Sequence, residues 1–235
     1  MKTVDTSLRH YLLPNINDNG WKYISIMTVF AIFTALIWFP LGVVFFALSV
    51  WCFYAFRDPD RVTPIISDAL IAPADGVITS ISKEKGPDCL GFANKTFVKI
   101  SIFSGICDAN IYRCPIKSKI AKVFYDCGKN FSLSLNKDDI GNERLSFSLK
   151  TSNGYEFIIQ QTSTLCSKRL KAGFKQGQEF LAGQRIGYSV FGAYTDIFLP
   201  EKVSPIVCVG QKMIAGETIM ADLHSDAPRI EGEIR

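Results

Sequence analysis

The sequence predicts a mainly β protein of the sandwich or barrel type, preceded by an N-terminal helical hairpin in a membrane. Two observations carry this prediction. From residue 70 onward, short segments that are rich in β-branched and aromatic residues follow one another, separated by turn signals. Ahead of them, no charged residue occurs between positions 24 and 56. A chain of 235 residues is long enough for one globular domain and such a membrane element.

The composition fits this division and excludes some classes of partner. A mean hydropathy of +0.16 is high for a purely soluble protein. The net charge of +4 is small and the basic residues are scattered, so we expect no nucleic-acid partner. The seven cysteines form no Cys-x-x-Cys pair, and their odd number favours reduced, buried thiols. Neither His10 nor His224 lies near a cysteine pair, so we expect no metal site.

We interpret the uncharged segment 24–56 as two membrane helices, at about 24–39 and 41–56. One straight helix of that length would rise about 50 Å, well beyond a hydrocarbon core of about 30 Å. Pro40, with Gly42 after it, lies near the middle and would interrupt a continuous helix. Each arm is short for a full span, so two tight spans and a re-entrant wedge both remain open. A buried hairpin of a soluble protein is the further alternative.

Basic residues on both flanks of the hairpin predict its orientation. Lys22 precedes the uncharged segment, and Arg57 and Arg61 follow it, so both ends are expected on the cytoplasmic side. The globular part is therefore expected at the cytoplasmic face of the cell membrane. We predict three domains: a polar N-terminal segment at 1–23, the hairpin at 24–56, and a β domain at 57–235.

Short strands dominate the predicted secondary structure of the β domain. We predict them at 70–72, 76–81, 97–103, 119–125, 146–150, 157–160 and 206–209. One short helix is predicted near 163–172, where Leu165 lies among basic residues. The chain shows no internal repeat and no low-complexity tract.

Six short motifs follow one another along the chain, at 56–61, 72–78, 142–144, 199–200, 209–212 and 215–219. In order and spacing they resemble the motifs of the short, bacterial-type phosphatidylserine decarboxylases. The resemblance implies a proenzyme that cuts its own chain before a serine, which becomes a pyruvoyl group. It also implies membrane phospholipid as a partner and a homodimer as the assembly.

The resemblance assigns three catalytic positions and one cleavage site. Asp75 stands at the family's aspartate position, Asn110 at its histidine position, and Ala193 at the position of its serine. The bond between Gly192 and Ala193 is the equivalent of the cleavage site. Pyruvoyl formation needs a nucleophile, a base and a group that orients the base. Asp75 is retained, whereas the other two positions have lost the required side chain.

Asparagine does not accept a proton near neutral pH, and alanine offers no oxygen that could attack. The surrounding positions differ as well, because Val190 and Tyr194 stand where the family has arginines and Tyr112 where it has an asparagine. Ser189 or Thr195 could replace the nucleophile only if the strained peptide bond lay at another position along the strand. Each step of one residue along a strand turns the side chain to the opposite face of the sheet.

Three functions remain open from the sequence. The first is a decarboxylase-like membrane protein of phospholipid metabolism that cannot self-process, is catalytically inactive and needs no cofactor. The second is an active decarboxylase, converting phosphatidylserine to phosphatidylethanolamine and carbon dioxide, with an atypical processing site and a pyruvoyl group. The third is a lipoyl-like carrier sandwich, suggested by the turns near 210–212 and 216–218, although Lys212 is not in a lipoyl-type context.

Overall fold

The computed structural model describes residues 15–18, 20–66, 68–128, 137, 141–163, 170–190 and 192–223. Internal contacts divide the chain into two compact units, Met1–Asp60 and Arg61–Arg235. Among the described residues, the first unit contains the helices α2 and α3, and the second contains the strands. This boundary lies four residues beyond the end predicted for the hairpin.

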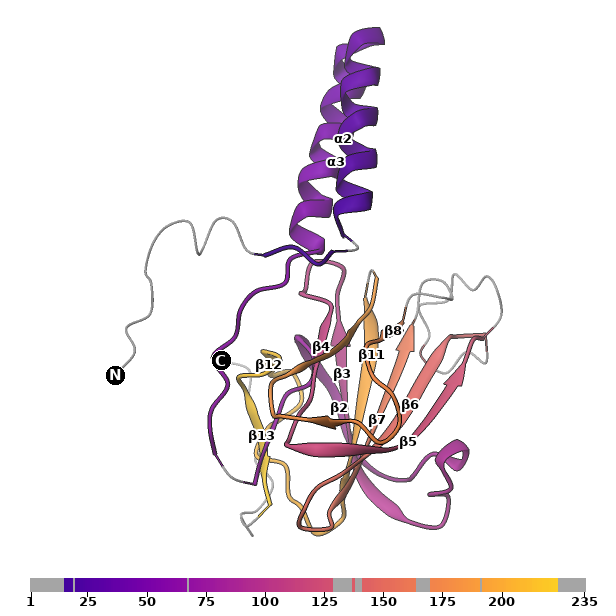
Figure 1. The fold of residues 1–235 in the computed structure, drawn as a ribbon, viewed down its shortest axis with the longest axis vertical. Helices are drawn as coiled ribbons and strands as arrows, with labels where there is room; N and C mark the ends of the chain where they lie inside the picture. Colours follow the sequence, from indigo (N-terminus) through magenta and orange to yellow (C-terminus); the bar gives the residue numbers. More distant parts are fainter. Residues whose placement is uncertain are drawn as a thin grey trace. The chain divides into compact units, whose positions relative to one another are not determined.

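The first unit is the predicted hairpin, formed by α2 (Gly20–Ile37) and α3 (Phe39–Ala55) side by side (Figure 1). Pro40 falls in the first turn of α3, where proline is tolerated because the N–H that it lacks would have no partner within the helix. The break predicted near Pro40 is therefore present. By length and composition, α2 could cross a membrane, and α3 is a shorter apolar helix.

Small residues let the two helices approach each other closely. A Cβ atom added at Gly42 would lie 2.4 Å from the Cβ of Ala35, so no larger residue fits without a shift. The hydroxyls of Thr28 and Ser49 are 2.8 Å apart across the same interface. The large apolar side chains point outward instead, which leaves the outer surface of the hairpin apolar.

The second unit is mainly β, as the sequence predicts. Its strands are β1 (Ala69–Ile71), β2 (Gly76–Lys85), β3 (Thr96–Ser104), β4 (Ile111–Arg113), β5 (Ser118–Asp126), β6 (Arg144–Lys150), β7 (Glu156–Ser163), β8 (Lys171–Ala172), β9 (Glu179–Phe180), β10 (Arg185–Tyr188), β11 (Ala193–Pro200), β12 (Lys212–Met213) and β13 (Ile219–Asp222). A short 3-10 helix at Asp88–Leu90 follows β2.

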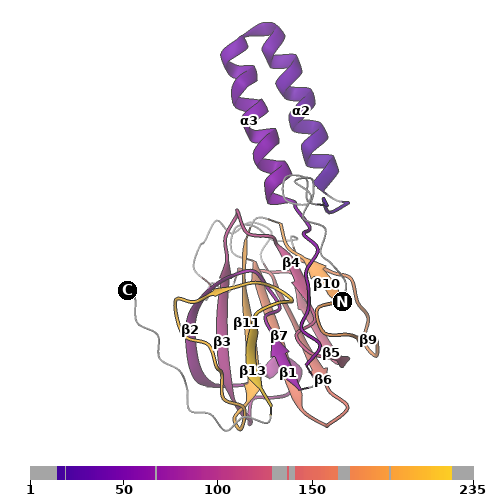
Figure 2. The same cartoon turned by 90° about the vertical axis from the view of Figure 1, so that its left-hand side faces the viewer.

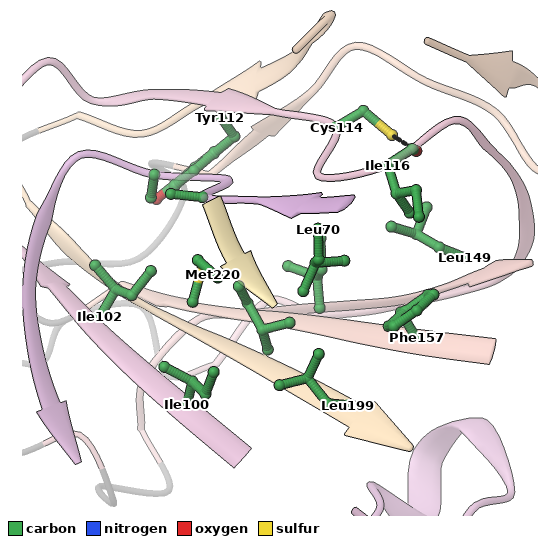
Figure 3. Close-up of a cluster of buried hydrophobic side chains, with 14 of the residues drawn as sticks. Leu70, Ile100, Ile102, Tyr112, Cys114, Ile116, Leu149, Phe157, Leu199 and Met220 are labelled. Atoms are coloured by element: carbon green, nitrogen blue, oxygen red, sulfur yellow. Dashed lines mark hydrogen bonds between the residues drawn. The ribbon is translucent and has the colours of Figure 1, made fainter. Parts of the chain in front are cut away.

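Eight strands form one large sheet in the order β12-β2-β3-β11-β7-β6-β5-β9 (Figure 2). Two strands, β1-β13, and three strands, β4-β10-β8, form two small sheets. Within the described part of the chain the large sheet is open, with β12 and β9 as its edges, so it is not a closed barrel. Side chains from the small sheets pack with those of the large one: Leu70 and Met220 share a buried cluster with Ile100 and Ile102 (Figure 3).

Two predicted elements differ from the structure. The segment 206–209 is not a strand, because the N–H of Gln211 donates to the carbonyl of Cys208 at 3.2 Å and closes a turn ahead of β12. Of the helix predicted near 163–172, both ends are strand: Ser163 belongs to β7 and Lys171 to β8. Residues 164–169 of that helix lie outside the described residues.

Candidate functional site

Ala193, at the position of the family's serine, is the first residue of β11 and is completely buried. β11 runs between two other strands of the large sheet. Ser104 of β3 lies opposite Ala193 on one side, and Ser163 of β7 lies opposite it on the other. Directly opposed residues have Cβ atoms about 4.5–5.5 Å apart and share a face of the sheet. The methyl group of Ala193 therefore lies between two buried serines.

The bond before Ala193 is held in a fixed geometry by Gly192. This glycine has a φ of +81°, in the left-handed region that residues with a Cβ rarely adopt. A Cβ atom at this position would also lie 2.9 Å from the carbonyl oxygen of Ser104. Backbone conformation and close approach thus both require glycine here, and the peptide at the cleavage-site equivalent is fixed against β3.

Asp75, in the turn before β2, is held by hydrogen bonds from three directions. Nη2 of Arg61 donates to its Oδ2 at 2.8 Å, and the backbone N–H of Ala215 donates to Oδ1 at 2.7 Å. The hydroxyl of Ser104 donates to the backbone carbonyl of Asp75 at 2.5 Å. Because Ser104 also pairs with Ala193, it brings the aspartate position next to the serine position.

Asn110 is buried just before β4 and is engaged on both sides of its amide. Its Nδ2 donates to the carbonyl of Asp108 at 3.0 Å, and its Oδ1 accepts from the hydroxyl of Ser189 at 3.5 Å. The backbone N–H of Ser189 donates to the carbonyl of Asn110 at 2.9 Å. Asn110 therefore connects its own loop to the segment that leads into β11, and its amide has no basic atom.

Tyr112, in β4, is buried in the hydrophobic core (Figure 3). Burial raises the pKa of its phenol, and weak interactions with Ser189 and Thr195 oppose the shift. Among the described residues, no hydrogen bond to the Tyr112 hydroxyl has ordinary geometry. At neutral pH the phenol is therefore neutral and does not act as a base.

The motif at 142–144 supports the scaffold around Ala193. Glu143 is completely buried, accepts from the hydroxyl of Tyr125 at 2.5 Å and accepts from the N–H of Leu170 at 3.2 Å. Burial and the hydrogen bond to Glu143 raise the pKa of Tyr125 to about 12. The carbonyl of Glu143 accepts from the N–H of Ser163 at 3.0 Å, so this motif fixes a neighbour of Ala193.

A small polar cavity of about 220 Å³ lies over the other face of β11 and its neighbours. Asp196 points to this face, and Nζ of Lys137 lies 2.6 Å from its Oδ1. Lys99 forms a second ion pair there with Glu84. Two ion pairs thus line this cavity, and residue alternation along β11 separates Asp196 from the face of Ala193.

Two residues that hold this site together, Arg61 and Ser104, could not be identified from the sequence. Arg61 lies in the first motif, but its ion pair with Asp75 joins residues fourteen positions apart that belong to no common element. Ser104 lies one residue beyond the predicted strand 97–103, and only the pairing of β3 with β11 places it beside Ala193. The spacing of the motifs carries no signal for either contact.

Comparison with known proteins adds the family context. A family model described as phosphatidylserine decarboxylase matches residues 48–221, a range that contains all three catalytic positions. The chain is 39% identical over 229 residues to the phosphatidylserine decarboxylase proenzyme of Paramagnetospirillum magneticum, covering 97% of this chain and 95% of that protein. It is 37% identical over 216 residues to the proenzyme of Ruegeria pomeroyi, covering 92% and 99%. For the proenzyme of Beijerinckia indica the identity is 33% over 223 residues.

Proposed function

The chain belongs to the phosphatidylserine decarboxylase family, and from this premise we propose that it is a member that cannot form the pyruvoyl group and is therefore catalytically inactive. The observation that carries the proposal is the alanine at position 193. Its side chain is a methyl group held in the core between Ser104 and Ser163.

The residues present do not fit a self-derived pyruvoyl group. Such a group derives from the residue that follows the cut bond, and this residue must bring its own oxygen. Alanine has none. The neighbouring hydroxyl of Ser104 belongs to another strand and already donates to the carbonyl of Asp75. A serine on a neighbouring strand could not become the new N-terminal residue of β11.

The second missing part is the base. Asn110 carries an amide, and no histidine occurs between positions 11 and 223. Asp75 keeps its place and its hydrogen bonds, but an orienting carboxylate has no imidazole to orient. The site thus has an aspartate at position 75 and lacks both a nucleophile at position 193 and a base at position 110.

We further propose that the protein is attached to the cytoplasmic face of the cell membrane by its hairpin. The support is the apolar outer surface of α2 and α3, together with the basic residues Lys22 and Arg57 at the base of the hairpin. A role in phospholipid metabolism without catalysis, as a lipid-binding or partner-binding protein, fits this attachment.

Intact mass of the purified protein tests the proposal. We expect a single species of about 26.2 kDa, because no group in the site can cut the chain. A pair of fragments that meet between Gly192 and Ala193 would show processing and would favour an active decarboxylase instead.

Restoring the two groups is the complementary test. Ala193→Ser alone should stay uncut, because the base is still missing and such residues act as a unit. Ala193→Ser combined with Asn110→His should be cut, whereas the matched control Ala193→Ser with Asn110→Ala should not. Efficient cleavage of the single variant would reveal another base and contradict the proposal.

A further inference from the structure

The turn between α2 and α3 is the most exposed apolar part of the hairpin. The exposed fractions are 83% for Leu36, 73% for Ile37, 62% for Trp38 and 73% for Phe39. Neither the last turn of α2 nor the first turn of α3 contains a charged residue. A turn that emerged into water on the far side of a bilayer would leave this whole apolar surface in water.

Part of the backbone of the same turn is satisfied by hydrogen bonds within the hairpin. The N–H of Trp38 donates to the carbonyl of Thr34 at 2.8 Å. The carbonyl of Trp38 accepts from the N–H groups of Leu41 and Gly42, at 3.1 and 3.3 Å. Pro40 has no N–H to satisfy. An unsatisfied backbone group in hydrocarbon costs several kcal/mol, so each of these hydrogen bonds lowers the cost of placing the turn in an environment without water.

Side-chain hydroxyls along the helices are satisfied inside the hairpin as well. Thr28 and Ser49 face each other between the helices, 2.8 Å apart. The hydroxyl of Thr34, near the turn, donates to the carbonyl of Phe30 at 2.7 Å. These groups therefore need no partner from a far aqueous phase.

The length of the arms sets how deep the turn can reach. From Lys22 to Trp38 a helix rises about 24 Å, against about 30 Å for the hydrocarbon core. α3, with 17 residues, rises about 26 Å. Trp21, Tyr23 and Tyr54 are exposed at the base of the hairpin, where an aromatic belt would mark the near interface. Even an upright hairpin anchored there stops about 5 Å before the far boundary, and the usual tilt shortens its reach.

From these four observations we propose that α2 and α3 form a re-entrant wedge, which enters and leaves through one leaflet and ends within the hydrocarbon. The partner of its outer surface is the acyl chains of the bilayer. The proposal rests on the membrane attachment given above and adds the position of the turn. It favours the wedge over two complete spans, because each arm rises by less than the thickness of the hydrocarbon core.

Tryptophan depth in vesicles tests the wedge. The three tryptophans are Trp21, Trp38 and Trp51. One full-length variant, Trp21→Phe with Trp51→Phe, keeps only Trp38. The matched control, Trp38→Phe with Trp51→Phe, keeps only Trp21. Each is reconstituted into phosphatidylcholine vesicles that carry bromine either near the headgroup or deep in the acyl chains, and iodide is added outside or trapped inside.

For Trp38 we expect greater loss of fluorescence from deep bromines than from shallow ones, and no quenching by iodide from either side. For Trp21 we expect greater loss of fluorescence from shallow bromines than from deep ones, together with quenching by iodide. If Trp38 is quenched by iodide, or more strongly by shallow bromines, the wedge is overturned. Flotation of the same vesicles separates the two proposals: a chain that does not float overturns the attachment and with it the wedge, whereas a floating chain with iodide-accessible Trp38 overturns the wedge alone.

Discussion

At the scale of the residue, Gly192 offers a direct measure of how tightly the cleavage-site equivalent is held. Gly154 has a similar φ, +83° against +81°, but a Cβ atom there would meet nothing within 4 Å. Gly154→Ala should therefore cost only the left-handed backbone, about 1 kcal/mol of unfolding free energy. Gly192→Ala adds a clash with the carbonyl of Ser104 and should cost about 2–3 kcal/mol. Urea unfolding of both variants makes the comparison, and equal costs would show that β3 does not confine this peptide.

The ion pair of Arg61 with Asp75 should contribute more than an exposed pair. The side chains are 19% and 9% exposed, whereas Lys83 and Glu201 form a pair that is 67% and 55% exposed. We expect Arg61→Gln to reduce the unfolding free energy by about 1–3 kcal/mol, because a buried carboxylate loses a charged donor. The control Lys83→Gln should change it by less than about 0.5 kcal/mol. Adding Asp75→Asn to Arg61→Gln should recover part of the loss; a further loss would mean that Asp75 does not depend on Arg61.

The raised pKa of the Tyr112 phenol predicts a fall in stability at alkaline pH. Burial raises the pKa of its phenol above the ordinary value of 10.0, so above that pH the unfolded chain releases a proton that the folded chain retains. Stability is then fully present below pH 10 and decreases as the pH rises beyond it. Tyr112→Phe should flatten this decrease, although Tyr125, with a pKa of about 12, still contributes to it. At pH 7 the variant should change stability by less than about 1 kcal/mol, because the hydroxyl makes no well-formed hydrogen bond. Denaturant midpoints at pH 7, 10 and 11 check both parts, and identical pH profiles would contradict the assignment.

At the scale of the element, helices and strands with a clear hydrophobic pattern could be predicted. The strands with which each one pairs could not. The uncharged segment and Pro40 located α2 and α3 to within a few residues. The strands predicted at 97–103 and 119–125 correspond to β3 and β5. The strand predicted at 206–209 is wrong, because a turn closed by Gln211 competes with strand formation there. Four residues carry too little periodicity to distinguish a strand from a turn.

The candidate site depends on pairings that no local pattern encodes. The motifs pointed to Asp75, Asn110 and Ala193 one by one. The connection of Asp75 to Ala193 through Ser104 depends on the register of β3 with β11, and a shift of one residue would turn the serine away from the core. The pairing of strands in the sheet therefore decides which side chains surround position 193. The sequence around that position does not give their identity.

At the scale of the whole molecule, the division into two units predicts where the chain can be shortened. A chain that begins at Arg61 retains every strand and the ion pair with Asp75. We expect it to be soluble without detergent, rich in β-structure by circular dichroism and cooperative in thermal unfolding. A chain that begins at Val62 loses the guanidinium and should unfold at a lower temperature. If both shortened chains were insoluble or unfolded, the hairpin would belong to the core of the second unit.

The central place of β11 has a consequence for how the protein returns from the unfolded state. β11 lies between β3 and β7 and is joined covalently to the chain that precedes it through Gly192. Were that bond cut, residues 193–235 would be a separate polypeptide, and refolding would become a second-order reaction that slows on dilution. An intact bond keeps the strand near its partners at a fixed effective concentration, so folding stays first order. On the proposed function, in which this bond stays intact, the chain keeps the capacity to refold as a single molecule.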